Sequence, residues 1–346
     1  MHMAKTNYRI QQDIILREKF EKQKSELPLY VEDYFVSVES STTPLTRLNY
    51  LTDLNIFFDY LAGRVFMKDK KKITTQDLDT LKTKDIERYL SFLSGYEKNG
   101  EIRTNSDTAK ARKLSAVRAF FKYLYANDLL SSNVASLVKT PKIRSKEIVR
   151  LETDEVAKII NLAENPDLLT KQQQGFNKHT KKRDVAMLSL MLGTGIRVSE
   201  CVGINNEDID FKNNAFTITR KGGSRVVLYF SDEIKKALLS YLEEKQDNPA
   251  IDPNENALFL SLQNKRITVR AVENMVKKYA KIISPLKKIS PHKLRSTYGT
   301  NLYRETKDIY IVADVLGHKD VNTTKKHYAA ISEDIRRDVA NVVKLR

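Results

Sequence analysis

Residues 290–303 read SPHKLRSTYGTNLY, and this stretch predicts how the C-terminal half of the chain folds. Serine is a favoured N-cap and proline a favoured first helical residue, so a helix is predicted to begin at Ser290 and Pro291. His292 and Arg295 are three residues apart and share one face of that helix. Cations are destabilising at the positive end of a helix dipole, so this basic first turn favours a bound anion such as phosphate. A basic turn that only faces solvent is the alternative.

Upstream, residues 193–200 read GTGIRVSE. The apolar segment 184–192 predicts a buried helix that ends at the glycines. Arg197 follows the glycines, at the predicted start of another helix. Glu200 lies three residues further on, where its carboxylate could hold Arg197 or accept hydrogen bonds from the first N–H groups of that helix. An ordinary surface ion pair, worth little energetically, is the alternative.

The clearest β pattern lies between these two segments. Residues 215–220 and 225–230 are rich in β-branched and aromatic side chains, and they flank Lys221-Gly222-Gly223-Ser224. Glycines between two such runs predict a β-hairpin. Lys221 would then lie at its tip, either simply solvated or delivered by a mobile hairpin as a proton donor.

Two further candidates follow the 290–303 segment. His318 comes directly after the apolar end of a predicted helix, Val315-Leu316-Gly317, and Tyr328 comes ten residues later. Tyr328 is preceded by the polar run TTKKH at 323–327, which is unusual for a tyrosine of the core. His327 is adjacent to it, but neighbouring side chains point apart on any regular element, so no role is assigned to His327.

The rest of the chain predicts two domains. Residues 1–26 form a polar N-terminal extension, either one helix or a frayed tail. Residues 27–140 form a helical domain, and 141–150 form a basic linker with no helical period. Residues 151–346 form a second domain, mainly α with a small sheet, that ends in an amphipathic tail helix at 332–346.

Helical periodicity is clearest in three stretches of the first domain. Their apolar residues recur at three- and four-residue steps, in 46–61, 84–93 and 106–126. In the second domain, the polar stretch 165–182, with three consecutive glutamines, predicts a loop insertion.

Composition restricts the class of partner. Sixty Lys and Arg against 44 Asp and Glu give a formal net charge of +16, which favours a polyanion such as nucleic acid, although a merely basic soluble protein is the alternative. The longest apolar run is too short to cross a bilayer, so no membrane partner is expected. A single cysteine, Cys201, has no internal disulfide partner, which favours a reducing cytosol.

Taken together, the motifs resemble the tyrosine recombinase (phage integrase) family. They are GTGIRVSE at 193–200, RKGGSR at 220–225, SPHKLRSTYGTNLY at 290–303, LGHKDVNTT at 316–324 and Tyr328. Their order is that of the family. The likeness is closest to the Xer recombinases of the single-protein streptococcal and lactococcal branch. It implies a mainly α fold, with an N-terminal helical core-binding (SAM-like) domain and a mostly α catalytic domain with a small antiparallel sheet.

The resemblance also implies a role for each residue that matches a family motif. Arg197 and Arg295 would contact the scissile phosphate, and Lys221 would give a proton to the leaving 5′ oxygen. His292 and His318 would handle the phosphate or protons, and Tyr328 would be the nucleophile. Relatives often have His or Lys where Ser296 stands, so Ser296 is assigned nothing.

The resemblance further implies partners and a place of action. The expected partner is double-stranded DNA with a specific recombination site, bound by a dimer at each site and by a homotetramer at synapsis. A septal DNA translocase is a further expected partner, and the location would be the cytoplasm, at the nucleoid. No cofactor is expected, since the sequence has neither an ATP motif nor a cluster with metal-ligand spacing.

Three other functions stay open. One is the integrase of a mobile element, although such enzymes often carry an arm-binding domain for which residues 1–26 are too short. The others are a helical DNA-binding protein without catalysis and a type IB topoisomerase, which shares the chemistry without choosing a site. A DNA-binding protein without catalysis would explain the charge and the helices, but not the ordered residues around Tyr328.

Overall fold

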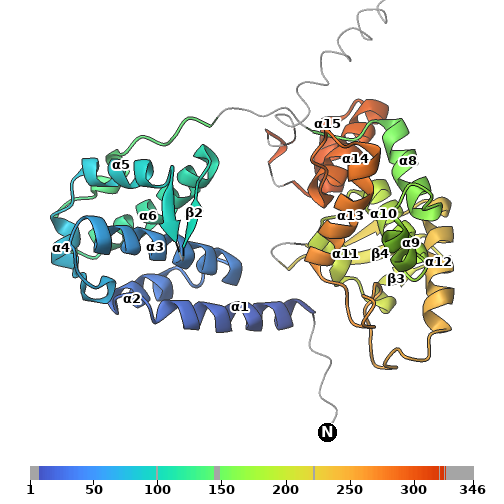
Figure 1. Cartoon of the computed structure of the whole chain (residues 1–346), viewed down its shortest axis with the longest axis horizontal. Coiled ribbons are helices and arrows are strands. Elements are labelled where there is room, and N and C mark those ends of the chain that lie inside the picture. The colour runs from blue at the N-terminus through green and yellow to red at the C-terminus, as the bar shows by residue number, and fades with distance from the viewer. Residues whose placement is uncertain are drawn as a thin grey trace, which may run out of the picture. The chain divides into compact units, whose positions relative to one another are not determined.

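The computed structural model describes residues 8–98, 100–143, 149–220, 223–318, 320–322 and 324. The chain divides into two compact units, Met1–Ser145 and Lys146–Arg346 (Figure 1), which are described separately. Its secondary structure is mostly helical, as the sequence predicted, and includes two small antiparallel sheets, of which the sequence predicted the one in the second unit. In the part of the chain that the structure describes, no helix is both long and apolar enough to cross a membrane.

The first unit is a helical bundle around an aromatic core. Its helices are α1 (Tyr8–Lys24), α2 (Tyr30–Ser37), α3 (Pro44–Arg64), α4 (Thr75–Asp79), α5 (Thr83–Phe92), α6 (Asp107–Ala126) and α7 (Val134–Leu137), with a 3₁₀ turn at Lys70–Lys72. Phe57 of α3 contacts Tyr89 and Phe121 edge-on, with ring centroids 5.0 and 6.0 Å apart, a geometry that aromatic pairs prefer. The three helices predicted from periodicity correspond to α3, α5 and α6.

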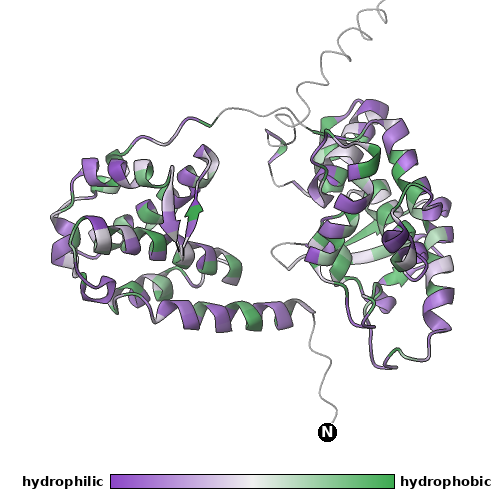
Figure 2. Cartoon of the chain, in the orientation of Figure 1, coloured by the Kyte–Doolittle hydropathy of each residue, from purple (hydrophilic) through white to green (hydrophobic). Residues whose placement is uncertain are grey.

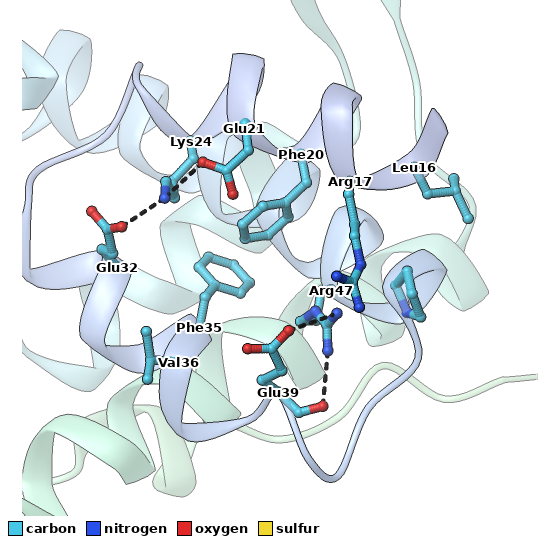
Figure 3. A pocket seen from close by; sticks show the side chains of 11 residues that line it. Leu16, Arg17, Phe20, Glu21, Lys24, Glu32, Phe35, Val36, Glu39 and Arg47 are labelled. Carbon is cyan, nitrogen blue, oxygen red and sulfur yellow. Dashed lines mark hydrogen bonds and ion pairs between the residues drawn. The ribbon is translucent and has the colours of Figure 1, made fainter. Parts of the chain in front are cut away.

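Helix α1 occupies most of the predicted polar extension. Hydrophilic residues run along most of it (Figure 2), and it packs against α3. A hollow of about 390 Å³ lies beside it, lined in part by Phe20 and Phe35 (Figure 3). The ring centroids of these two residues are 4.9 Å apart. Lys24 pairs with Glu32 at 2.6 Å at the rim of the hollow. Charged side chains of α1 and α2 thus pair beside this hollow.

A β-ribbon interrupts the first unit, although the sequence predicted only helices there. Strands β1 (Tyr96–Lys98) and β2 (Glu101–Arg103) pair antiparallel, with Tyr96 opposite Arg103. Gly100, at φ +77°, lies in the turn between them. Each strand has three residues, which is too few for an alternating pattern to be recognised in the sequence.

The second unit is built around α10 (Lys181–Thr194). This helix is buried over most of its length and packs against α8 (Thr153–Glu164), α12 (Asp232–Gln246) and α14 (Pro291–Thr306). The remaining helices are α9 (Lys171–Asn177), α11 (Val198–Gly203), α13 (Val269–Ile283) and α15 (Ile309–Leu316), with a 3₁₀ turn at Asn206–Asp208. Because α10 is surrounded by other helices, its C-terminal end is a rigid base for the residues that follow it.

The predicted hairpin is confirmed. Strands β4 (Ala215–Thr219) and β5 (Arg225–Tyr229) pair antiparallel, and β3 (Ile209–Asp210) adds to the outer edge of β4, in the order β3-β4-β5. Thr219 lies opposite Arg225, so the loop between the strands comprises residues 220–224. This short sheet places the motif RKGGSR at one end of a hairpin.

The loop predicted over 165–182 is wrong in its middle and at its last two residues, which already belong to α10. Residues Lys171–Asn177 form α9, which begins at Thr170 with a capping box to Gln173. Asn177 is 1 % exposed and donates from Nδ2 to the hydroxyl of Tyr279 at 2.9 Å. A buried hydrogen bond thus joins the end of this polar segment to α13, a helix distant in the sequence.

Candidate active site

Gly195 forms the turn that precedes Arg197. It ends α10 with φ +64°, a left-handed conformation that glycine adopts at little cost. A Cβ at this position would overlap the ring of Tyr298 on α14 and lie 3.0 Å from Cδ2 of Leu316 on α15. Only glycine therefore allows α14 and α15 to approach the end of α10 so closely.

Arg197 is held by Glu200 in the way the sequence suggested. Arg197 is the N-cap of α11, and its backbone N–H donates to Oε2 of Glu200 at 2.8 Å. Its guanidinium Nη1 donates to the other carboxylate oxygen, also at 2.8 Å. The Glu200 side chain is 4 % exposed, whereas that of Arg197 is 36 % exposed. Glu200 thus orients a guanidinium that stays accessible to a ligand.

Arg295 lies one turn inside α14 and is 6 % exposed. Its Nη1 donates to the carbonyl of Gly195 at 2.6 Å, and its Nη2 donates to the carbonyl of Leu316. Gly195 is two residues before Arg197, and Leu316 is two residues before His318. One buried guanidinium therefore joins the turn before Arg197 to the end of the helix before His318.

His292 lies in the first turn of the same helix. As predicted, the helix has Ser290 as N-cap and Pro291 as its first residue, although the Ser290 side chain accepts no capping hydrogen bond. The side chain of His292 is exposed, in contrast to Arg295 one turn later. Exposed at a helix N-terminus, His292 could meet an anionic ligand that arrives from solvent.

His318 follows the left-handed turn at Gly317, which ends α15 with φ +61°. Its backbone N–H donates to the carbonyl of Ala313 at 2.9 Å, so the turn is closed around it. The ring Nδ1 lies 2.7 Å from Oγ1 of Thr324, a side chain with no exposed area. This hydrogen bond to a buried partner sets the direction in which Nε2 points.

Arg220 makes a contact with α15 that the sequence did not predict. Its Nη2 donates to the carbonyl of Val315 at 2.8 Å, so the loop end of the β4–β5 hairpin meets the end of α15. The only signals in the sequence were the position of Arg220 in RKGGSR and the glycine at 317. Neither indicates by itself which carbonyl an arginine reaches across 95 residues.

Some of the predicted site residues are not among those that the structure describes. Lys221 and Tyr328, the predicted proton donor and nucleophile, lie outside the described residues, as do His327 and the predicted tail helix 332–346. Tyr298, beside Gly195, is partly buried, and this burial raises the pKa of its phenol. Tyr298 therefore stays protonated at neutral pH and packs as an apolar ring.

Across the described ranges, no group of three or more His, Cys, Asp or Glu side chains is placed to hold a metal ion. Near the motifs the described charges are mainly guanidinium groups, and the one buried carboxylate among them, Glu200, is bonded to Arg197.

Comparisons with known proteins agree with this geometry. Residues 149–334 match the phage integrase family, and residues 30–128 match the N-terminal SAM-like domain of phage integrases. Tyrosine recombinase XerC of Caldanaerobacter subterraneus is 32 % identical over 321 residues, covering 89 % of this chain and 84 % of the relative. Tyrosine recombinase XerS of Streptococcus uberis is 30 % identical over 348 residues, covering 92 % and 97 %.

Solved structures share the fold at lower identity. The XerH recombinase in a pre-cleavage complex with its difH substrate has a TM-score of 0.59 at 18 % identity, covering 83 % of this chain and 76 % of that one. A lambda integrase dimer bound to a core site has a TM-score of 0.59 at 15 % identity, covering 86 % and 93 %. On the family matches and the relatives, this chain belongs to the phage integrase family of tyrosine recombinases, enzymes that cut and rejoin DNA through a covalent tyrosine intermediate.

Proposed function

We propose that this recombinase resolves chromosome dimers by exchanging strands at a specific site, with Tyr328 as the nucleophile. The observation that carries the proposal is the pair of hydrogen bonds from Arg295 to the carbonyls of Gly195 and Leu316. These bonds bring together the segments that contain Arg197, Arg295 and His318. A DNA-binding protein without catalysis has no need for this arrangement.

The first step is a transesterification. The Tyr328 hydroxyl gives its proton to His318, its oxygen attacks the scissile phosphorus to form an O–P bond, and the bond from phosphorus to the 5′ oxygen breaks. Lys221 gives a proton to that leaving oxygen, and the product is a 3′-phosphotyrosine. In the second step a 5′ hydroxyl of the partner strand gives its proton to Lys221 and attacks this linkage, and Tyr328 leaves with the proton that His318 returns. The number of phosphoester bonds is unchanged throughout, so the reaction needs no ATP.

Charge stabilisation lowers the barrier. A phenol has a pKa near 10 and is a weak nucleophile at neutral pH, so the pentacoordinate transition state needs strong stabilisation. Arg197, oriented by Glu200, would bind non-bridging oxygens, and Arg295 would add a second fixed positive charge. His292 at the N-terminus of α14 would contact the phosphate, and His318 would assist proton movement.

The assembly would follow the DNA. We expect a dimer on each recombination site and a homotetramer when two sites are synapsed, with a septal DNA translocase as activating partner at the nucleoid. The relatives named tyrosine recombinase XerC and XerS support the Xer-type assignment from which we expect this role. The net charge of +16 supports tight contact with the DNA backbone.

The test is covalent trapping on candidate sites. The purified chain is incubated with nicked duplexes that contain chromosomal dimer-resolution sequences, and with duplexes of the same composition and scrambled order. The expected result is an adduct that survives SDS on the specific duplex alone, with the label on a peptide that contains Tyr328. Binding without any adduct would support the non-catalytic alternative, and relaxation of supercoiled DNA without site choice would support a topoisomerase.

A further inference from the structure

Arg220 occupies the junction between the hairpin and its loop. It follows β4 directly, and its backbone closes the loop: its N–H donates to the carbonyl of Ser224 at 2.8 Å, and its carbonyl accepts from Gly223 at 2.9 Å. The side chain leaves this junction for α15, where Nη2 donates to the carbonyl of Val315 at 2.8 Å. A contact from Nη1 to the carbonyl of Asp314, at 3.5 Å, is at the limit of a hydrogen bond.

The end of α15 requires donors from outside the helix. The last carbonyls of any helix have no partner within it and form the negative end of its dipole. Gly317 N–H donates to Asp314 and His318 N–H to Ala313, while Arg295 donates to Leu316. Val315 receives the bond from Arg220. Two arginines from different elements thus complete the cap of the helix that leads to His318.

Gly317 leaves room for this contact. A Cβ at Gly317 would lie 2.8 Å from Nε of Arg220 and would overlap the rest of the guanidinium. The positive φ of +61° independently favours glycine. Two constraints therefore meet at this turn, one from the backbone and one from the Arg220 side chain.

We propose that Arg220 is a positioning residue for catalysis. It fixes the end of the hairpin, from which Lys221 is the next residue, against the turn that carries His318. The inference rests on the proposed function, in which Lys221 protonates the leaving oxygen. Without this bond, only backbone hydrogen bonds of the sheet and of the loop would fix the loop end of the hairpin, and a displacement of about 1 Å can slow a reaction on the order of 100-fold.

The test compares two leaving groups. A nicked substrate with an ordinary phosphate needs a proton on its departing 5′ oxygen, whereas one with a 5′-bridging sulfur releases a thiolate that needs none. Arg220→Ala should cleave the ordinary substrate about 10–100-fold more slowly than the unaltered chain. On the sulfur substrate its rate should return to within about 3-fold, the pattern expected of Lys221→Ala in weaker form.

Three controls make the result specific. Arg270→Ala removes an 81 % exposed arginine that pairs with Glu273, and it should cleave both substrates at the unaltered rate. Arg220→Lys keeps the positive charge and can still donate a hydrogen bond, so it should recover part of the rate that Arg220→Ala loses. DNA affinity and the thermal unfolding of each variant are measured in parallel.

Failure of the positioning role of Arg220 and failure of the proposed function give different results. Equal losses of Arg220→Ala on both substrates, or normal cleavage of both, would overturn the positioning role. If the unaltered chain forms no adduct on either substrate, the proposed function itself fails. A further check combines Arg220→Ala with Gly317→Ala: the losses should be less than multiplicative because the guanidinium that the new methyl would displace is absent. Multiplicative losses would contradict the contact.

Discussion

The guanidinium of Arg295 donates to the carbonyl of Gly195 at 2.6 Å, across 100 residues of sequence. Its other amino group bonds the carbonyl of Leu316. Arg295 therefore fixes two turns as well as supplying charge, whereas Arg197 bonds the carboxylate of Glu200 within its own helix start. The two arginines should respond differently to the same substitution.

Arg197→Gln should slow DNA cleavage by about 100–1,000-fold, because it removes transition-state charge from an accessible position. Its loss of thermal stability should be smaller than that of Arg295→Gln, because the backbone N–H of residue 197 still donates to Glu200. Arg295→Gln should slow cleavage as much and also lower the unfolding temperature, because buried carbonyls lose their charged donor. Single-turnover cleavage and thermal unfolding are measured for both. An unchanged unfolding temperature in Arg295→Gln would contradict the structural half of its role.

Tyr328→Phe should abolish covalent DNA adducts while folding and DNA binding stay intact, because only the hydroxyl is removed. The adduct is measured on a nicked suicide substrate by SDS gel, and affinity by anisotropy. Tyr298→Phe is the matched control and should keep full cleavage, because burial raises the pKa of that phenol and Tyr298 packs as a ring. A labelled adduct formed by Tyr328→Phe would disprove the assignment.

Cleavage should persist in excess EDTA. Guanidinium and lysine groups provide the charge that a divalent metal provides in other phosphoryl-transfer enzymes. Rates are compared on the same suicide substrate with EDTA and with added Mg²⁺ or Mn²⁺. A loss of cleavage that only a divalent metal restores would require another mechanism.

DNA affinity should fall steeply with salt. Neutralising some 6–10 phosphates would weaken binding by about 10³–10⁵-fold between 50 and 200 mM salt. The affinity for a single site is measured by anisotropy over this range, and the net charge of +16 is the reason for the expectation. A nearly flat profile would show that contacts to phosphates contribute little.

Deleting residues 332–346 should leave binding to a single site nearly intact and impair synapsis and strand exchange. The resemblance to the family implies that this tail docks on a neighbouring subunit. The predicted tail helix starts only a few residues after Tyr328, so such docking would set the position of the nucleophile. Alternate switching of active sites around a tetramer would then prevent four simultaneous cuts. Gel shifts with one site and recombination assays with two sites measure both effects.

Two results would argue against the tail's role between subunits. A truncated chain that recombines normally would show that the tail is dispensable. A truncated chain that fails to fold would show that the tail packs on its own domain, as most terminal helices with an apolar face do. Far-ultraviolet circular dichroism of the truncated chain distinguishes this case from a defect in synapsis.

Local features of the second domain followed from the sequence. The helix start at Pro291, the hairpin around residues 220–224 and the pairing of Arg197 with Glu200 agree with what spacing predicted. Caps, tight turns and pairs three residues apart depend on atoms that the chain places together whatever the rest of the fold does. Helix α9 was missed because its polar residues show no periodicity.

The sequence by itself determined the chemistry that this chain can offer and the order in which its motifs follow one another. It also determined the family, because five short motifs in one order are specific together. Only the tertiary structure decided that Arg295 reaches Gly195 and Leu316 and that Arg220 reaches Val315. In the sequence, every backbone carbonyl is an equivalent acceptor. An arginine bonds a particular carbonyl only where packing buries that carbonyl within reach of the guanidinium and excludes water from it.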